Sequence, residues 1–198
     1  MDKKYNIQDD VRQSLLEAAS NIFSHYGYNK TTVDDIAKAA RKGKSTFYYY
    51  YKSKEEIFQD VIEKEAQIFK LKLIESISIE GNPIEKIKRY ILTRLHTFKD
   101  LVNFYKAFRH ENRDHFNFIE RTRGKYDIEQ VNIIKMILIE GINKNIIEIN
   151  DIDLAAESLA VILKGLEYNL LFSLTDVVIE EEKIDKILSM LFYGIVKK

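Results

Sequence analysis

The scarcity of helix-breaking residues is the feature that most constrains the fold. The chain of 198 residues contains one proline and seven glycines. Apolar residues recur with the helical period throughout, and no segment alternates in the manner of a strand. Hydrophobic residues make up 45% of the chain and charged residues 31%, which supports a packed core and argues against disorder. The sequence therefore predicts an all-α protein.

Cap and turn residues divide the chain into predicted helices. The first is expected over about residues 8–26, with Gly27 ending it. A short helix capped by Thr31 or Thr32 follows, and then a second short helix over about 44–51. Asn82 and Pro83 mark the clearest later boundary. The remaining helices are expected to start at about 54 and to span about 83–100, 102–112, 116–145, 152–174 and 180–196. Asp151 or Asp153 is expected to cap the helix at about 152–174.

This pattern predicts two domains. Residues 1–53 form a small three-helix unit, which we interpret as a helix-turn-helix DNA-binding domain. Residues 54–198 form a larger helical bundle. The N-terminus lacks the apolar run of a signal peptide, no window predicts a membrane span, and cysteine is absent. We therefore expect a cytoplasmic protein that has no membrane partner.

Charge is distributed unevenly along the chain. The formal net charge is zero, but residues 1–54 carry ten Lys/Arg against six Asp/Glu, a difference of +4 that the remainder balances with −4. The six basic residues from Lys38 to Lys54 have no acidic residue among them. Such a patch indicates a face for a polyanion; an ordinary solvated helix face is the alternative.

The stretch Gly43-Lys44-Ser45 has the ending of a phosphate-binding loop. The first glycine of that motif would fall at position 38, where the chain has a lysine within a predicted helix, and no strand precedes it. The motif is therefore incomplete, and a nucleotide site is not predicted.

Two short helices with a tight break between them, after a longer supporting helix, favour a helix-turn-helix. Phe47 and Tyr51 share one face of the second short helix and are expected to pack inward. The outer faces carry Lys44, Ser45, Thr46, Tyr48 and Tyr49. Phenol and ammonium groups there suit phosphate and thymine contacts, and Lys54 is expected to add a phosphate contact.

The segments TTVDDIAKAA and KSTFYYYYKSKEEIF resemble the DNA-binding domain of the TetR/AcrR transcriptional regulators. The resemblance is specific over about residues 10–58 and looser beyond. It implies an all-helical homodimer that binds double-stranded DNA at a palindromic operator. It also implies that residues 54–198 are a ligand-binding and dimerisation domain. By position it implies DNA contacts from Thr32, Lys44, Thr46, Tyr48, Tyr49, Tyr50 and Lys54.

Two positions depart from the family pattern. Arg41 stands at the turn where the family usually has glycine, and Lys42 stands where a small apolar residue is usual. If the turn needs a positive φ, an arginine costs about 1–2 kcal/mol relative to glycine. Both residues add positive charge beside the DNA surface, so we include them among the predicted DNA-binding residues.

The last two predicted helices are strongly apolar, and by resemblance they form an intersubunit four-helix bundle. The predicted dimer-interface residues are Leu159, Ile162, Leu166, Leu170, Ile187 and Leu191. The alternative is an ordinary intrachain core.

Polar and aromatic residues among the apolar positions of the bundle suit an effector cavity. The candidates are Tyr90, His96, Phe104, Phe108, Arg109, Tyr126 and Glu167. His110 and His115 are five residues apart and fall on different helix faces, so no metal site is predicted, and no cofactor is predicted either. The chain shows no nucleophile–base pair, so an enzyme is not expected.

The sequence thus predicts a ligand-responsive transcriptional regulator, a repressor that binds a palindromic operator as a homodimer and responds to a small, largely apolar effector. The alternative is a helical ligand-binding or protein-interaction module in which the N-terminal three-helix unit, here called the head, has drifted and no longer binds DNA.

Overall fold

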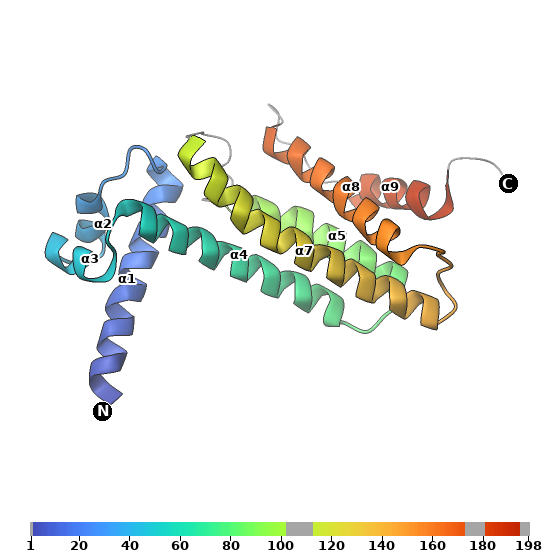
Figure 1. The fold of residues 1–198 in the computed structure, drawn as a ribbon, viewed down its shortest axis with the longest axis horizontal. Coiled ribbons are helices and arrows are strands. Elements are labelled where there is room, and N and C mark those ends of the chain that lie inside the picture. Colours follow the sequence, from blue (N-terminus) through green and yellow to red (C-terminus); the bar gives the residue numbers. More distant parts are fainter. Residues whose placement is uncertain (1, 102–112, 173–180, 195–198) are drawn as a thin grey trace. The chain divides into compact units, whose positions relative to one another are not determined.

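The computed structural model describes residues 2–101, 113–172 and 181–194. Every regular element in these ranges is a helix, as predicted. The bounds are α1 Asp2–Tyr26, α2 Val33–Ala39, α3 Lys44–Tyr50, α4 Lys54–Ser78, α5 Pro83–Asp100, α7 Arg113–Asn143, α8 Ile152–Phe172 and α9 Glu181–Tyr193 (Figure 1). The helix predicted at about 102–112 lies outside the described residues. No helix in the described ranges is both long and apolar enough to cross a membrane.

Most helix ends fall at the predicted signals. Gly27 ends α1 with a φ of 79°, and its N–H donates to the Phe23 carbonyl at 2.9 Å. The Asn82 side chain accepts from the N–H of Ile84 at 2.9 Å before α5. The Asp151 side chain accepts from the N–H of Leu154 at 2.9 Å at the start of α8. The start of α1 differs, because this helix begins at Asp2 and not near residue 8.

The chain forms two compact units. One contains residues 2–68, Leu101 and the first turns of α7 to Ile119; the other contains residues 69–100 and those from Glu120 onward. The division falls within α4, whereas the predicted boundary between residues 53 and 54 is at the start of that helix.

The core of the N-terminal unit joins the first helices to the start of α4. Phe23 of α1 meets Phe58 of α4 edge-on, with 5.1 Å between ring centroids. Ile36 of α2 and Phe47 of α3 are fully buried. Because each short helix inserts only one or two apolar side chains, its remaining faces are available to solvent.

Ion pairs link the helices of the C-terminal unit. Lys86 of α5 lies 2.8 Å from Glu140 of α7, and Lys88 of α5 lies 2.8 Å from Asp185 of α9.

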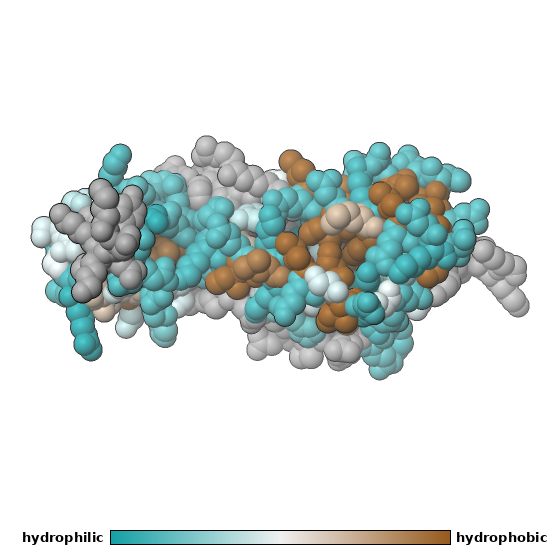
Figure 2. Space-filling model, turned by 90° about the horizontal axis from the view of Figure 1, so that it is seen from below, coloured by the Kyte–Doolittle hydropathy of each residue, from teal (hydrophilic) through white to brown (hydrophobic). Residues whose placement is uncertain are grey.

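The surface in Figure 2 is largely hydrophilic, with apolar patches between the polar side chains. Large apolar residues that are exposed in this unit include Leu71, Ile128, Met136, Leu154, Val161 and Met190.

Candidate nucleic-acid interface

Helix α3 is held by one face and presents the others. Phe47 and Tyr51, at its centre and its C-terminal cap, are both buried, which confirms the predicted inward face. Their rings lie 5.8 Å apart. Tyr48 is 50% and Tyr49 69% exposed, although most tyrosines bury their rings at least in part. The sequence therefore places two aromatic rings on the outside of a short, well-anchored helix.

The anchor of α3 includes an electrostatic contact. The Arg12 guanidinium of α1 lies 5.5 Å from the Tyr51 ring centroid and pairs with Asp60 of α4. Burial is the main reason that the pKa of Tyr51 is raised to about 12, with Arg12 opposing and Asp60 adding to the shift. The ring thus stays neutral at physiological pH and packs as part of the core.

The N-terminus of α2 is closed by a capping box. The Thr32 hydroxyl accepts from the N–H of Asp35 at 3.2 Å, and the Asp35 carboxylate accepts from the N–H of Thr32 at 2.9 Å. The Thr32 hydroxyl and N–H donate to this carboxylate and lower the pKa of Asp35. Thr32, not Thr31, is therefore the cap, and it is exposed at the end of a fixed helix.

The turn between α2 and α3 is a Schellman motif. The N–H of Arg41 donates to the Lys38 carbonyl at 3.0 Å, and the N–H of Lys42 donates to the Ala37 carbonyl at 2.8 Å. Arg41 has a φ of 54°, so the turn keeps the left-handed residue that usually favours glycine. The helix-turn-helix geometry is thus present despite the departure at this position. Arg41 is exposed and Lys42 half-buried.

Lys44 begins α3 beside an acidic neighbour. Its ammonium lies 3.1 Å from the Asp34 carboxylate of α2, with both side chains more than half exposed. The hydrogen bond and the charge of Asp34 raise the pKa of Lys44. The cation is therefore present across the physiological range and is accessible from solvent.

Lys54 has a role that the sequence did not predict. Its ammonium donates to the Tyr28 carbonyl at 2.9 Å and to the Thr31 carbonyl at 2.8 Å, and it lies 4.1 Å from the Tyr28 ring centroid. Burial lowers the pKa of Lys54. This residue ties the loop between α1 and α2 to the start of α4, so it is first a structural residue of the head. Only one of its three N–H donors is left for a phosphate.

The predicted DNA-binding residues thus share one small domain with differing exposure. Exposed are Thr32, Arg41, Lys44, Ser45, Tyr48 and Tyr49, and half-buried are Lys42, Thr46, Tyr50 and Lys54. An α-helix with polar and aromatic side chains on its open faces fits the width of the DNA major groove.

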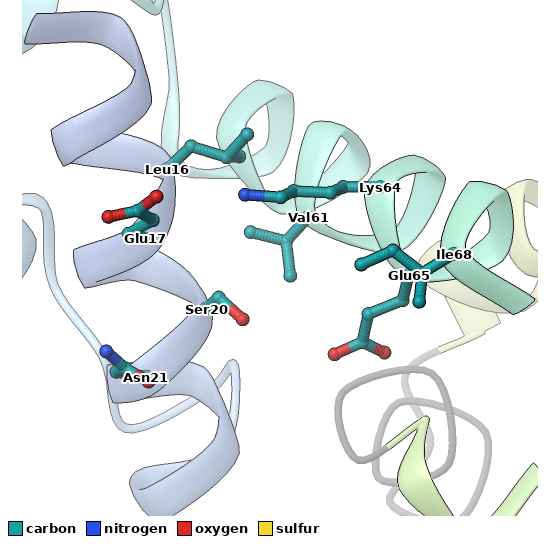
Figure 3. A pocket seen from close by; sticks show the side chains of 8 residues that line it. All are labelled: Leu16, Glu17, Ser20, Asn21, Val61, Lys64, Glu65 and Ile68. Carbon is teal, nitrogen blue, oxygen red and sulfur yellow. The ribbon is translucent and has the colours of Figure 1, made fainter. Parts of the chain in front are cut away.

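A cleft of about 260 Å³ lies elsewhere in the same unit, between α1 and α4. Figure 3 shows its lining, with Glu17 and Ser20 on α1 opposite Lys64 and Glu65 on α4. It contains none of the predicted ligand-binding residues. Charges of both signs and a wide opening make it a poor match for a largely apolar effector.

The predicted ligand-binding residues divide into four groups. Tyr90 and Glu167 are buried in the C-terminal unit. Tyr126 is half-buried. His96 is exposed, so the structure does not support its placement in an interior cavity; it lies off the helix face that buries Tyr90. Phe104, Phe108 and Arg109 lie outside the described residues.

The sequence-based prediction missed Arg94, which pairs with Glu167 in the interior. A signal was available, because Arg94 stands four residues after Tyr90 and so falls on the buried stripe of α5. Gln130 of α7, also missed, is 3% exposed.

The predicted dimer-interface residues pack partly within one chain. Leu159, Ile162, Leu166 and Ile187 are half-buried and Leu191 is 40% exposed; the side chain of Leu170 is not described. The five residues other than Leu170 line one apolar groove with residues of α5, α8 and α9, namely Ile91, Leu163, Ile184 and Leu188.

The family described as bacterial regulatory proteins, tetR family, has a sequence model that matches residues 15–61. The uncharacterized HTH-type transcriptional regulator YhgD of Bacillus subtilis is 28% identical over 147 residues, which cover 74% of this chain and 77% of YhgD. The negative transcriptional regulator of the biofilm operon, IcaR of Staphylococcus epidermidis, is 38% identical over 53 residues, which cover 27% of this chain and 29% of IcaR.

A solved structure extends the likeness to nearly the whole chain. The Clostridium perfringens "putative fatty acid metabolism regulator" is 33% identical, with a TM-score of 0.63, and the match covers 93% of this chain and 100% of that one.

Proposed function

The chain belongs to the TetR family of bacterial transcriptional regulators, and from this premise we propose that it is a homodimeric repressor, released from a palindromic operator by a small, largely apolar effector. The observation that carries the DNA-binding half of the proposal is helix α3. Phe47 and Tyr51 fix it from inside, while Lys44, Tyr48 and Tyr49 face solvent. IcaR, a negative regulator, supports the repressor assignment by similarity.

In this proposal Tyr48 and Tyr49 contact base edges or phosphates in the major groove, and Thr46 and Tyr50 support them. Thr32, Ser45, Arg41, Lys42 and Lys44 contact the backbone. Each cation that meets a phosphate releases a counterion, so binding weakens steeply with salt. Lys54 acts mainly by positioning the loop that carries Thr32, because two of its donors hold that loop.

Selection of bound duplexes from a random DNA library by the purified protein tests the proposal. We expect an enriched palindrome with two half-sites about one helical turn apart. Tyr49→Ala should weaken binding to that duplex by about tenfold or more and leave the thermal unfolding temperature unchanged. Tyr26→Ala is the matched control, since Tyr26 of α1 is 67% exposed and lies outside the predicted interface. Recovery of no motif would favour the alternative, a helical module with a head that does not bind DNA.

The homodimer part of the proposal is supported by the open face of α8. Val161 is 70% exposed, and a β-carbon at Gly165, one turn later, would meet nothing within 4 Å. A second copy of α8 has room to approach closely there. Val161→Glu should produce monomers in analytical ultracentrifugation, whereas Ile128→Glu, at an equally exposed position of α7, should not. Dimers in both variants would remove the face of α8 that carries Val161 from the interface.

The effector part of the proposal is supported by the buried polar residues of the C-terminal unit. The C. perfringens relative is named as a putative regulator of fatty acid metabolism. We therefore propose that the effector has an acyl-like apolar body. Release of the selected duplex by candidate molecules, followed by fluorescence anisotropy, tests this part.

A further inference from the structure

A buried polar layer crosses the C-terminal unit. Tyr90 and Arg94 of α5, Gln130 of α7 and Glu167 of α8 are each at most 5% exposed. Buried neighbours of Tyr90 and Arg94 along α5 include the apolar residues Ile91 and Leu95. Burial of a charged pair is no more stabilising than an apolar core of the same volume, and often less. Such a layer is therefore better explained by a ligand than by packing alone.

The centre of the layer is a neutral ion pair. The Nε of Arg94 donates to Oε1 of Glu167, and the two side chains are 6% and 1% exposed. Burial disfavours the charge on Arg94, but the Glu167 carboxylate and the Tyr90 hydroxyl together outweigh this effect and raise the pKa of Arg94. The guanidinium lies 5.5 Å from the centroid of the Phe69 ring. The charge of Arg94 is thus already neutralised within the protein.

Gln130 belongs to the same layer by register. Phe69 of α4 contacts the Arg94 guanidinium through its ring, and the next residue is Lys70. The Lys70 ammonium lies 2.8 Å from the Glu129 carboxylate of α7. Gln130 is the next residue of α7 and points to the interior. Among the residues that the structure describes, no hydrogen-bond acceptor pairs with its Nε2. A buried amide donor without an acceptor is costly, and a ligand that supplies the acceptor recovers this cost.

We propose that this layer recognises the polar end of the effector, and that this end is an uncharged hydrogen-bond acceptor, such as an amide, ester or ketone carbonyl, on an apolar body. The inference rests on the proposed function and specifies its effector. The carbonyl oxygen accepts from Gln130 Nε2 beside the Arg94–Glu167 pair.

Charge balance gives the selectivity. A carboxylate ligand would place two anions beside one guanidinium and leave a net negative charge in the interior. An ammonium ligand would leave a net positive charge. Because an uncompensated buried charge is strongly destabilising, both should bind more weakly than a neutral molecule of the same shape.

Three probes of one chain length test the inference on the full-length protein by isothermal titration calorimetry: decanamide, decanoate and decylammonium. We expect wild-type protein to bind decanamide at least about tenfold more tightly than either ion. Glu167→Gln leaves Arg94 as an unpaired cation, so this variant should reverse the order and prefer decanoate by a similar factor. Gln130→Leu should weaken decanamide without improving decanoate.

Glu140→Gln is the matched control, since Glu140 is a paired glutamate of α7 that lies toward the surface; this variant should keep the wild-type order. Tighter decanoate binding by wild-type protein, no binding of any probe, or an unchanged order in Glu167→Gln would each overturn the inference. The order of probe affinities in wild-type protein tests the inference without any variant. The inference can therefore be refuted even if the Glu167→Gln protein misfolds. Since the readout is direct binding, failure here is distinct from failure to select a duplex.

Discussion

The left-handed arginine in the DNA-binding head gives a prediction with opposite signs in two assays. Arg41 has a φ of 54°, and a residue with a β-carbon pays about 1–2 kcal/mol for that conformation. Glycine relieves this cost, but its greater conformational entropy in the unfolded chain destabilises the folded state by about 0.5–1 kcal/mol. The difference predicts that Arg41→Gly raises the free energy of unfolding by about 0.5–1 kcal/mol. For a chain of this size the unfolding temperature then rises by about 1–4 °C.

The same substitution should weaken DNA binding. Arg41 is exposed at the turn before α3, where its charge is available to a phosphate. Loss of one phosphate contact lowers the slope of log affinity against log salt concentration by about one. Fluorescence anisotropy with the selected duplex at several salt concentrations measures this slope, and differential scanning calorimetry measures the unfolding temperature.

Two further variants separate conformation from charge. Asn145 ends α7 in the same kind of turn with a φ of 53°, and asparagine tolerates this conformation. Arg41→Asn should therefore stabilise the head, though less than Arg41→Gly. Arg41→Lys keeps both the β-carbon and the charge and should change neither result much. A lower unfolding temperature for Arg41→Gly would refute the reasoning, since it would mean that the arginine side chain stabilises the turn by more than the strain costs.

Two other residues of the head give predictions. Lys54→Met removes two charge-assisted hydrogen bonds and should lower the free energy of unfolding by about 2 kcal/mol. It should weaken DNA binding with little change in the slope of log affinity against log salt concentration. A slope that falls by about one would show that Lys54 contacts a phosphate. Tyr51 has a folded pKa of about 12 against 10.0 unfolded, so the folded protein retains this proton longer, and the stability it supports is present below pH 10 and lost as the pH rises toward 12. Tyr51→Phe should lack that part of the alkaline loss in thermal scans, whereas equal alkaline loss in both proteins would show that other groups control it.

The sequence was informative wherever structure is local. Gly27, Asn82 and Asp151 end or begin helices in the structure as their residue types predict. The division of α3 into a buried and an exposed face followed from the spacing of Phe47 and Tyr51. The start of α1 was misplaced because residue types that favour the N-cap recur in its first turns, at Asp2, Asn6 and Asp9, so residue type does not single out one start.

Contacts between distant segments of the chain cannot be predicted from sequence patterns. The ammonium of Lys54 meets the carbonyls of Tyr28 and Thr31, and backbone carbonyls leave no mark in the sequence. A lysine at the start of a helix beside a basic patch was therefore interpreted only as a phosphate contact. The spacing of Arg94 from Tyr90 places it on the buried stripe of α5, but charged residues are usually exposed, and its partner Glu167 lies on another helix.

The charges of the head suggest why a strained arginine is retained at the turn. Lys44, the first residue of α3, is shared with Asp34, and Lys54 is held by backbone carbonyls. Two of the predicted cations thus have partners within the protein. Exposed ion pairs contribute little, so a phosphate can replace Asp34, but the acidic side chain stays near the anion and lowers the gain. Arg41 supplies a further charge at the same turn. In the proposed function, its conformational cost is the stability that the domain loses in exchange for DNA affinity. Neutralising Asp34 in Asp34→Asn should then lower the affinity lost on Arg41→Gly.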